Sequence, residues 1–344
     1  MNGAASPLRS ARALPAAVAR AAGWLRAHRA EALVIVALVV AGAALRPAAA
    51  TASAQPVSVA PQYGRAAVTA WFAESTGRYL VPVTRRMDDG VVSPRRALEA
   101  LLAGPLAGPE LRPVFAPGAS VASFDTRFGE AVVDLAAGAL DGVDAARAVD
   151  AAVLTITESG DLGTVRLSVA GVPVDADGRA AASSVALPRP AVNPETPAAE
   201  AGGVELYFAF GAQDQYLVPV TRADDVVDPG EAFAQLLAGP RPDAGLRPAV
   251  PTNVSLLSWR TDGALAVLDV DEQLIYAYRL SKANALHVRK AIMATLTRLP
   301  GIKAGMLEIN GSRMLMYTCI NVTQEFPQGR PWALNDEFYL SERS

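Results

Sequence analysis

The seven-residue stretch YLVPVTR occurs twice in the chain, and this repetition most constrains the fold. It runs from Tyr79 to Arg85 and returns 137 positions later from Tyr216 to Arg222. Seven identical consecutive residues are too specific to arise from composition alone. The chain therefore contains an internal repeat.

Three other short words recur in the same order and at nearly the same offset. They are LLAGP at 101–105 and 236–240, LRP at 111–113 and 246–248, and VVDL at 132–135 against VLDV at 267–270. A repeating unit of roughly 110 residues has the size of a small domain rather than of a solenoid repeat. The sequence predicts two copies of one domain, over residues 65–172 and 204–317.

Each copy opens with a strand-like run of β-branched and aromatic residues, at 66–73 and 204–210. The repeated YLVPVTR follows as a second short strand. Pro82 and Pro219 lack a backbone N–H, so they limit this strand to the edge of a sheet.

A helix is predicted next in each copy. Ser93 and Asp228 precede a proline and are the expected N-caps, and the glycine and proline of LLAGP end the helix. Two short alternating runs joined by a turn, a longer helix and a final strand complete the copy. The order β(β)αββαβ, with two helices on one face of a small sheet, predicts an α+β sandwich in each copy.

The N-terminal region predicts membrane insertion. Residues 1–31 carry five arginines against one acidic residue, and an uncharged apolar run follows at 32–45. This asymmetry is typical of a segment whose N-terminus stays in the cytoplasm. We expect residues 1–31 to be a basic cytoplasmic segment, 32–47 an uncleaved transmembrane anchor and 48–64 a tether. A cleaved signal peptide is the alternative, and both interpretations place the rest of the chain outside the cytoplasm.

Two further segments, 173–203 and 318–344, are not part of the predicted repeat. The first is rich in proline and alanine and is the expected interdomain linker, and the second is the expected C-terminal tail. Charged residues are 19% of the 344 residues and the formal net charge is −3, so no basic excess indicates nucleic-acid binding. The one cysteine, Cys319, cannot form an intrachain disulfide and is expected to be buried and inert.

The residue types predict no enzymatic chemistry. His28 precedes the expected anchor, and His287 stands beside Arg289 and Lys290 on a helix face that we expect to be solvated. The sequence contains no HExxH, Walker A, GxGxxG or GxSxG motif. We therefore expect a protein without catalytic residues, cofactors or metal ligands.

Two acidic features are repeated. The pairs at 88–89 and 224–225 could supply oxygen ligands to calcium, but an isolated pair before a helix cap favours a solvated turn. Asp134 and Asp269 occupy one position of an alternating strand. They either face solvent or are buried carboxylates that accept hydrogen bonds from the amides of a neighbouring loop, and both interpretations remain open.

Aromatic and polar residues supply the candidates for contact with a partner. Trp71, Trp259 and Trp332 could stack on sugars, although anchoring a core or an interface is the commoner role. The candidate partner-facing residues are the polar members of the repeated strand, Tyr79, Arg85, Tyr216 and Arg222.

The order of these motifs resembles that of the GerMN domain family. The motifs are LVPVTR, the proline-capped helix that ends in LLAGP, the LRP segment, VVDL or VLDV, and the helix and strand that follow. The resemblance covers roughly residues 65–172 and 204–315. It implies a ring-building-motif-like fold, a place outside the cytoplasmic membrane and no known enzymatic activity. Relatives are often lipoproteins with a cysteine after the apolar run. This sequence has none there, which favours a transmembrane anchor.

The resemblance also implies side-by-side packing in envelope assemblies of sporulating cells. We therefore expect a single-pass protein of the cell membrane whose extracytoplasmic domains act as assembly modules in sporulation or spore germination. The expected partners are the membrane and envelope proteins of a sporulation complex, with homo-oligomer formation as a further option. The alternative is an extracytoplasmic ligand- or cell-wall-binding sensor, which predicts a saturable cleft between the domains near residues 172–203.

Overall fold

The computed structural model describes residues 66–337 except 89, 107–108, 159–160, 202, 224–227, 279–281, 314–315, 318–319, 322–325 and 328–333. The predicted anchor at 32–47, Cys319 and Trp332 lie outside the described residues. No helix within the described part of the chain is long and apolar enough to cross a membrane.

The first repeat contains two sheets and two helices. The strands and helices are β1 (Ala67–Glu74), β2 (Leu80–Arg86), α3 (Pro94–Leu102), β3 (Leu111–Arg112), β4 (Val121–Arg127), β5 (Glu130–Leu135), α4 (Ala145–Thr157) and β6 (Thr164–Val169). The hairpin β1–β2 forms one sheet with β3, and β4, β5 and β6 form the other. β5 and β6 are parallel because α4 connects them as a crossover.

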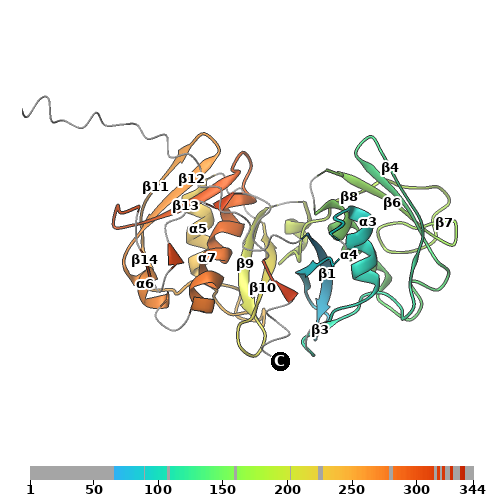
Figure 1. Cartoon of the computed structure of the whole chain (residues 1–344), viewed down its shortest axis with the longest axis horizontal. Helices are drawn as coiled ribbons and strands as arrows, with labels where there is room; N and C mark the ends of the chain where they lie inside the picture. The colour runs from blue at the N-terminus through green and yellow to red at the C-terminus, as the bar shows by residue number, and fades with distance from the viewer. Residues whose placement is uncertain are drawn as a thin grey trace, which may run out of the picture. The chain divides into compact units, whose positions relative to one another are not determined.

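The helices α3 and α4 lie between these two sheets. Both helices pack on β1, and α4 also packs on β6 (Figure 1). The core is continuous through the three layers, and Trp71, Leu98 and Ile156 are fully buried in it. The sequence predicted the α+β class and the two helices on a small sheet. It did not predict that the opening hairpin forms a separate sheet over the opposite side of the helices.

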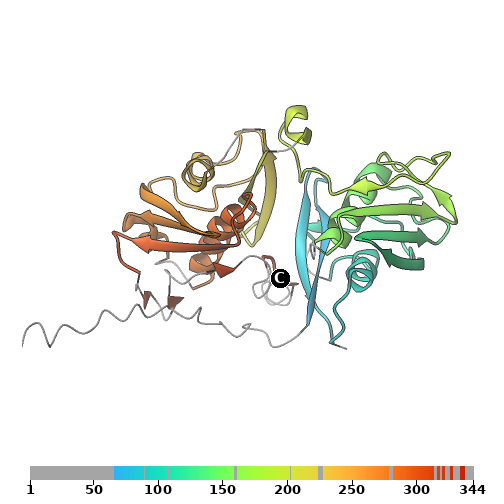
Figure 2. The ribbon, with the colours of Figure 1, turned by 90° about the horizontal axis from the view of Figure 1, so that it is seen from above.

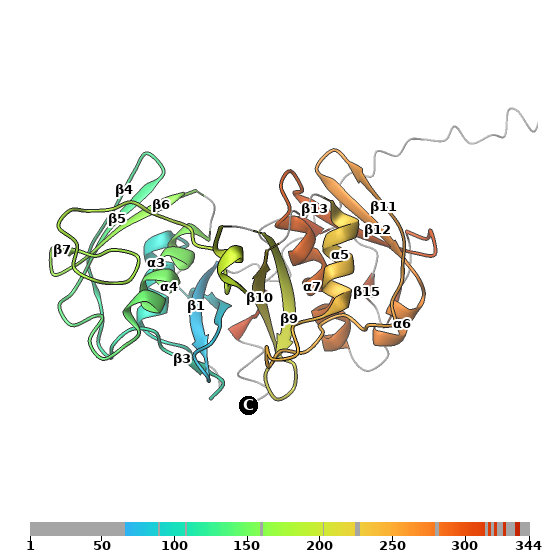
Figure 3. The ribbon, with the colours of Figure 1, turned by 180° about the vertical axis from the view of Figure 1, so that it is seen from behind.

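The second repeat has the same order with two differences: a short extra helix precedes its long helix, and the isolated bridge between Ala209 and Arg247 stands where the first repeat has β3. It comprises β9 (Val204–Phe210), β10 (Tyr216–Arg222), α5 (Pro229–Ala238), β11 (Leu256–Asp262), β12 (Leu265–Val270), α6 (Gln273–Tyr278), α7 (Lys282–Thr297) and β13 (Ala304–Ile309). α5 and α7 pack on β9 on one side and on β11 and β13 on the other (Figure 3). β12 and β13 are parallel, as β5 and β6 are.

The predicted helix ends are confirmed in both copies. The Ser93 side chain accepts a hydrogen bond from the Arg96 amide at 3.2 Å, and Asp228 accepts one from the Glu231 amide at 2.9 Å. Gly104 and Gly239 both have a φ near +80°, which glycine adopts without the steric cost that a side chain would bring.

The segment between the repeats has structure of its own. It contains β7 (Val172–Pro173), β8 (Leu187–Pro188) and the 3₁₀ helix η1 (Pro197–Ala201), and both short strands pair with β6. After the second repeat come β14 (Met316–Tyr317), β15 (Ile320–Asn321) and β16 (Phe326–Pro327), of which β16 extends the sheet of β13. Val192 and Asn335 are each only 2% exposed, so both flanking segments contribute to the packed structure.

Candidate functional site: a strand clamp between the repeats

The two copies of YLVPVTR form strands β2 and β10, which lie next to each other (blue and yellow in Figure 2). Each is the edge of its own hairpin, because β2 pairs with β1 and β10 pairs with β9. Pro82 and Pro219 face the same way as Leu80 and Leu217, which are two residues earlier in their strands. The missing proline N–H prevents a continuous backbone ladder between β2 and β10, so other groups must satisfy these edges.

Asn193, from the segment between the repeats, bridges the two strands. Its Oδ1 accepts a hydrogen bond from the Leu80 amide at 2.8 Å. Its Nδ2 donates to the Leu80 carbonyl at 2.8 Å and to the Pro219 carbonyl at 2.7 Å. One side chain thus bonds to β2 and β10 together.

Asn335, which follows the second repeat, makes the same bonds with the strands exchanged. Its Oδ1 accepts from the Leu217 amide at 2.8 Å. Its Nδ2 donates to the Leu217 carbonyl at 2.9 Å and to the Pro82 carbonyl at 2.7 Å. The two asparagines are therefore related by a pseudo-two-fold operation that interchanges the repeats.

A glutamate two residues after each asparagine holds the arginine of YLVPVTR. Glu195 accepts from Arg222 Nε at 2.8 Å and from its Nη2 at 2.9 Å. Glu337 accepts from Arg85 Nε at 2.7 Å and from its Nη2 at 3.0 Å. Two parallel N–H···O bonds fix the orientation of an arginine as well as its charge.

Each arginine also closes the end of the first helix of its repeat. Arg85 donates to the carbonyls of Ala100 and Gly104 at 3.0 and 2.6 Å. Arg222 donates to the carbonyls of Gln235 and Gly239 at 3.4 and 3.0 Å. The last carbonyls of a helix have no partner within the helix, and a cation is favourable there. VTR and LLAGP therefore recur together because the arginine of one binds the helix end formed by the other.

We call Asn193, Glu195, Asn335 and Glu337 the strand clamp. They belong to a second repeated word, AVNPE at 191–195 and ALNDE at 333–337, 142 positions apart. The prediction that both segments lie outside the repeat is wrong at these residues, because Asn193 and Asn335 bind the repeated strands in the same way. The backbone confirms the correspondence, because Pro194 forms a parallel bridge with Thr221 and Asp336 forms one with Thr84.

The four candidate partner-facing residues all have their contacts within this chain. Tyr79 and Tyr216 are 8% and 1% exposed, and the Tyr79 hydroxyl donates to the Ala244 carbonyl at 2.9 Å. Burial raises the pKa of Tyr216 to about 12 and raises that of Tyr79. Arg85 and Arg222 are bound by the strand clamp. We therefore no longer propose these four as a surface for a separate partner.

A second ionic group joins the repeats away from the clamp. Glu158, after α4, accepts from Arg298, after α7, at 2.9 Å and from Arg189 at 2.7 Å. Burial alone would raise the pKa of Glu158, but the two guanidinium groups outweigh it and hold the pKa below its ordinary value. Arg298 also pairs with Glu205 at 3.2 Å.

Asp134 and Asp269 are half-buried carboxylates that bond to a loop, as one of the two open interpretations predicted. Asp134 Oδ1 accepts from the Gly171 amide at 2.9 Å, and Asp269 Oδ1 accepts from the Gly311 amide at 2.8 Å. Both glycines have positive φ in the turn after the last strand of their repeat. These aspartates therefore hold the turn that follows β6 and β13.

The other candidates are dispersed. Trp71 is fully buried, and Trp259 is 41% exposed. His287 is half-buried and Arg289 is 2% exposed, so the expected solvated helix face is wrong at these positions. Of the acidic pairs, Asp88 is exposed, while 89 and 224–225 lie outside the described residues. Among the described residues, no group of three or more His, Cys, Asp or Glu side chains could hold a metal ion.

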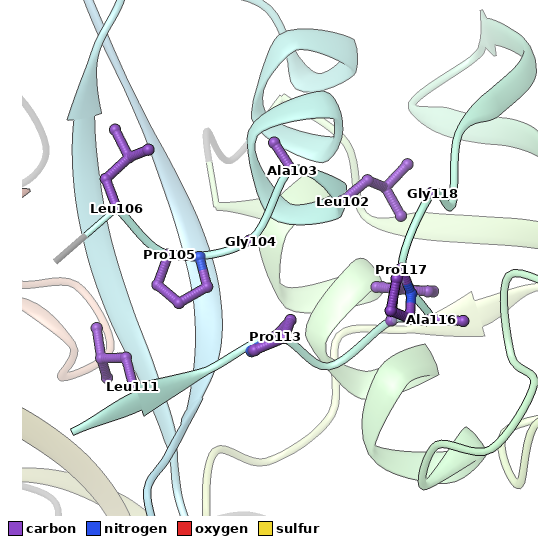
Figure 4. A pocket seen from close by; sticks show the side chains of 11 residues that line it. Leu102, Ala103, Gly104, Pro105, Leu106, Leu111, Pro113, Ala116, Pro117 and Gly118 are labelled. Carbon is purple, nitrogen blue, oxygen red and sulfur yellow. The ribbon is translucent and has the colours of Figure 1, made fainter. Parts of the chain in front are cut away.

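Two cavities adjoin the strand clamp. One, of about 620 Å³, is lined by β2, α4, residues 191–197 and residues 241–244. The other, of about 520 Å³, lies at the end of α3 and has an apolar lining that includes Leu106, Leu111 and Pro117 (Figure 4).

Comparison with known proteins adds a family and a fold. The family Germane, described as "Sporulation and spore germination", matches residues 69–175 and 205–314. The tandem GerMN domains of the sporulation protein GerM from Bacillus subtilis superpose with a TM-score of 0.59 and 23% identity, over 79% of this chain and 99% of that chain. The first GerMN domain of GerM gives a TM-score of 0.30 and 19% identity, over 36% of this chain and 97% of that chain. No curated protein matches the sequence.

Proposed function

Because the chain belongs to the Germane family of sporulation and spore germination proteins, we propose that it is a non-enzymatic assembly protein of the cell envelope. Its tandem GerMN domains act in sporulation or germination by packing against other envelope proteins. The resemblance of this chain to the GerMN family is confirmed by the family match, which covers both repeats. The fold likeness to the tandem domains of GerM agrees with it.

The strand clamp is the observation that best supports an assembly role. Its asparagines make six hydrogen bonds to the edges of both repeats, and its glutamates hold two arginines. Such a joint orders two domains relative to each other, at a cost in conformational entropy that a flexible tether would avoid. A pair of domains that is held together can offer a partner one composite surface.

The strands β4 and β11 offer edges for packing. Among the described strands, β4 and β11 each have one neighbour in their sheet, so each leaves a row of backbone groups unpaired. Leu257 and Trp259 on β11 are 52% and 41% exposed, and Phe128 beside β4 is fully exposed. Exposed edge strands with apolar side chains are a common route to protein–protein packing.

The membrane part of the proposal rests on the sequence. The arginine-rich segment 1–31 before the apolar run at 32–45 supports a single-pass anchor with residues 48–344 outside the cytoplasm. The partners would then be other proteins of the envelope, with a second copy of this chain as a further candidate.

Crosslinking and affinity capture of the full-length protein from native membranes tests the proposal. Cells are compared during growth and during spore formation. We expect envelope proteins to be captured in sporulating cells only, and Leu257→Glu to reduce that capture. Val185→Glu, at an exposed apolar residue outside β4 and β11, is the matched control. Recovery of an uncrosslinked monomer in both states would contradict the assembly role.

A second candidate function is an extracytoplasmic ligand- or cell-wall-binding module. One observation favours it. The cavity of about 620 Å³ is lined by residues of both repeats and of the segment 191–197, where this interpretation predicts a cleft.

A further inference from the structure

The 620 Å³ cavity contains charged groups that the strand clamp does not use. Ligand pockets have volumes of about 300–1,000 Å³ and are mostly apolar, so this cavity has a suitable size but an unusual polarity. Three arginines and three aspartates line it, namely Arg78, Arg147, Arg241, Asp144, Asp150 and Asp243. The remaining acidic lining residue, Glu195, is held by Arg222. The lining is therefore balanced in charge.

The carboxylate of Asp150 is a hydrogen-bond acceptor that no described residue occupies. Asp150 lies on α4, two turns after the N-cap Asp144, and is half-buried. No described residue donates a hydrogen bond to its carboxylate, whereas Asp144 accepts one from the Arg147 amide at 3.2 Å. Burial raises the pKa of Asp150 to about 6, and Arg147 opposes this while Asp144 and Glu200 add to it. A bound cation would compensate this carboxylate.

Arg241 and Arg78 supply donors. Arg241 is exposed, and no acidic group of the described residues forms an ion pair with it. Arg78 is half exposed. Its Nη1 donates to the Asp243 carbonyl at 2.5 Å, but its Nη2 lies 3.9 Å from the Asp243 carboxylate, so the Nη2 donors are open to a ligand. Guanidinium groups with free N–H donors bind a carboxylate well. Leu80, Leu154 and Val220 give the same cavity an apolar part.

We propose that this cavity binds a short zwitterionic peptide, with its ammonium group at Asp150 and its carboxylate at Arg78 and Arg241. The apolar part accepts small side chains. This inference names the ligand class for the second candidate function and rests on it, but it does not depend on the assembly role.

Calorimetric titration of the purified full-length protein tests the proposal. The probes are tri-alanine, N-acetyl-tri-alanine and tri-alanine amide. We expect tri-alanine to bind, and loss of either terminal charge to weaken binding about tenfold or more, because each removes a charged hydrogen bond. Absence of binding by tri-alanine and by hydrolysed cell-wall peptide alike would overturn both this inference and the second candidate function.

Two variants locate the binding. Asp150→Asn should weaken the binding of tri-alanine but not that of N-acetyl-tri-alanine. Arg241→Gln should weaken the binding of tri-alanine but not that of tri-alanine amide. Asp125→Asn, at an exposed aspartate on β4, is the control and should change nothing. Equal binding by wild type and Asp150→Asn would overturn the assigned site while leaving a ligand-binding function standing. Tighter binding of hydrolysed wall peptide than of tri-alanine would identify the cell wall as the source of the ligand. Equal binding of the two would identify a free peptide as the ligand.

Discussion

Asn335→Ala removes the clamp residue that is best shielded from water. Asn335 is 2% exposed and makes three hydrogen bonds, to the Leu217 amide, the Leu217 carbonyl and the Pro82 carbonyl. Each such bond contributes roughly 1 kcal/mol net, and water cannot reach these groups in the folded protein. We therefore expect the free energy of unfolding to fall by about 3 kcal/mol.

Urea unfolding followed by circular dichroism measures this change. Asn253→Ala is the matched control, since Asn253 is exposed and makes one bond of 3.3 Å to Gln273, so its effect should stay within about 0.5 kcal/mol. Asn335→Asp should be worse than Asn335→Ala, because it places a carboxylate against two carbonyl oxygens. A loss below about 0.5 kcal/mol for Asn335→Ala would refute the role given to the clamp.

Three further predictions each concern a single residue. Asp150→Asn should raise the free energy of unfolding at pH 7.5 by about 1 kcal/mol. Folding raises the pKa of Asp150 from 3.8 to about 6, so the ionised carboxylate destabilises the folded protein, and partial exposure to solvent reduces this effect. The destabilisation by Asp150 is absent below pH 3.8 and complete above pH 6. In thermal unfolding experiments the extra stability of Asp150→Asn should therefore vanish near pH 3.5. Arg85→Lys should lower the free energy of unfolding by about 2 kcal/mol, because lysine cannot bind Glu337 and the helix end with a bidentate fork, and an unchanged urea midpoint would contradict this. Gly230→Ala places a Cβ 2.4 Å from the Trp259 ring, so the indole should move outward and its fluorescence shift to the red, an effect that must disappear in a Trp259→Phe background.

The local elements of the fold could be read from the sequence because local chemistry determines them. Ser93 and Asp228 cap helices through their own side chains, and Pro82 and Pro219 exclude a central strand without reference to the rest of the fold. The separate hairpin sheet could not be predicted in this way. A strand buried on both faces has no alternation that shows which layer it joins.

The strand clamp was missed for a related reason. Its repeated word has an offset of 142 rather than 135 to 137, and it lies in segments whose composition is that of a linker and a tail. Asn193 and Glu195 bind residues 26 or more positions away, so nothing in their immediate surroundings indicates the contact. Comparison of the two flanking segments with each other, rather than of the domains alone, would have found AVNPE and ALNDE.

Amide hydrogen exchange, resolved by residue, tests the central claim most directly. The Leu80, Thr84 and Leu217 amides lie on strand edges, and the structure pairs them with Asn193 Oδ1, the Asn335 carbonyl and Asn335 Oδ1, respectively. If the strand clamp joins the repeats, these amides exchange as slowly as those paired within the β1–β2 and β9–β10 hairpins. Exchange at the rate of freely exposed edge amides would show that the clamp does not hold the two repeats together in solution.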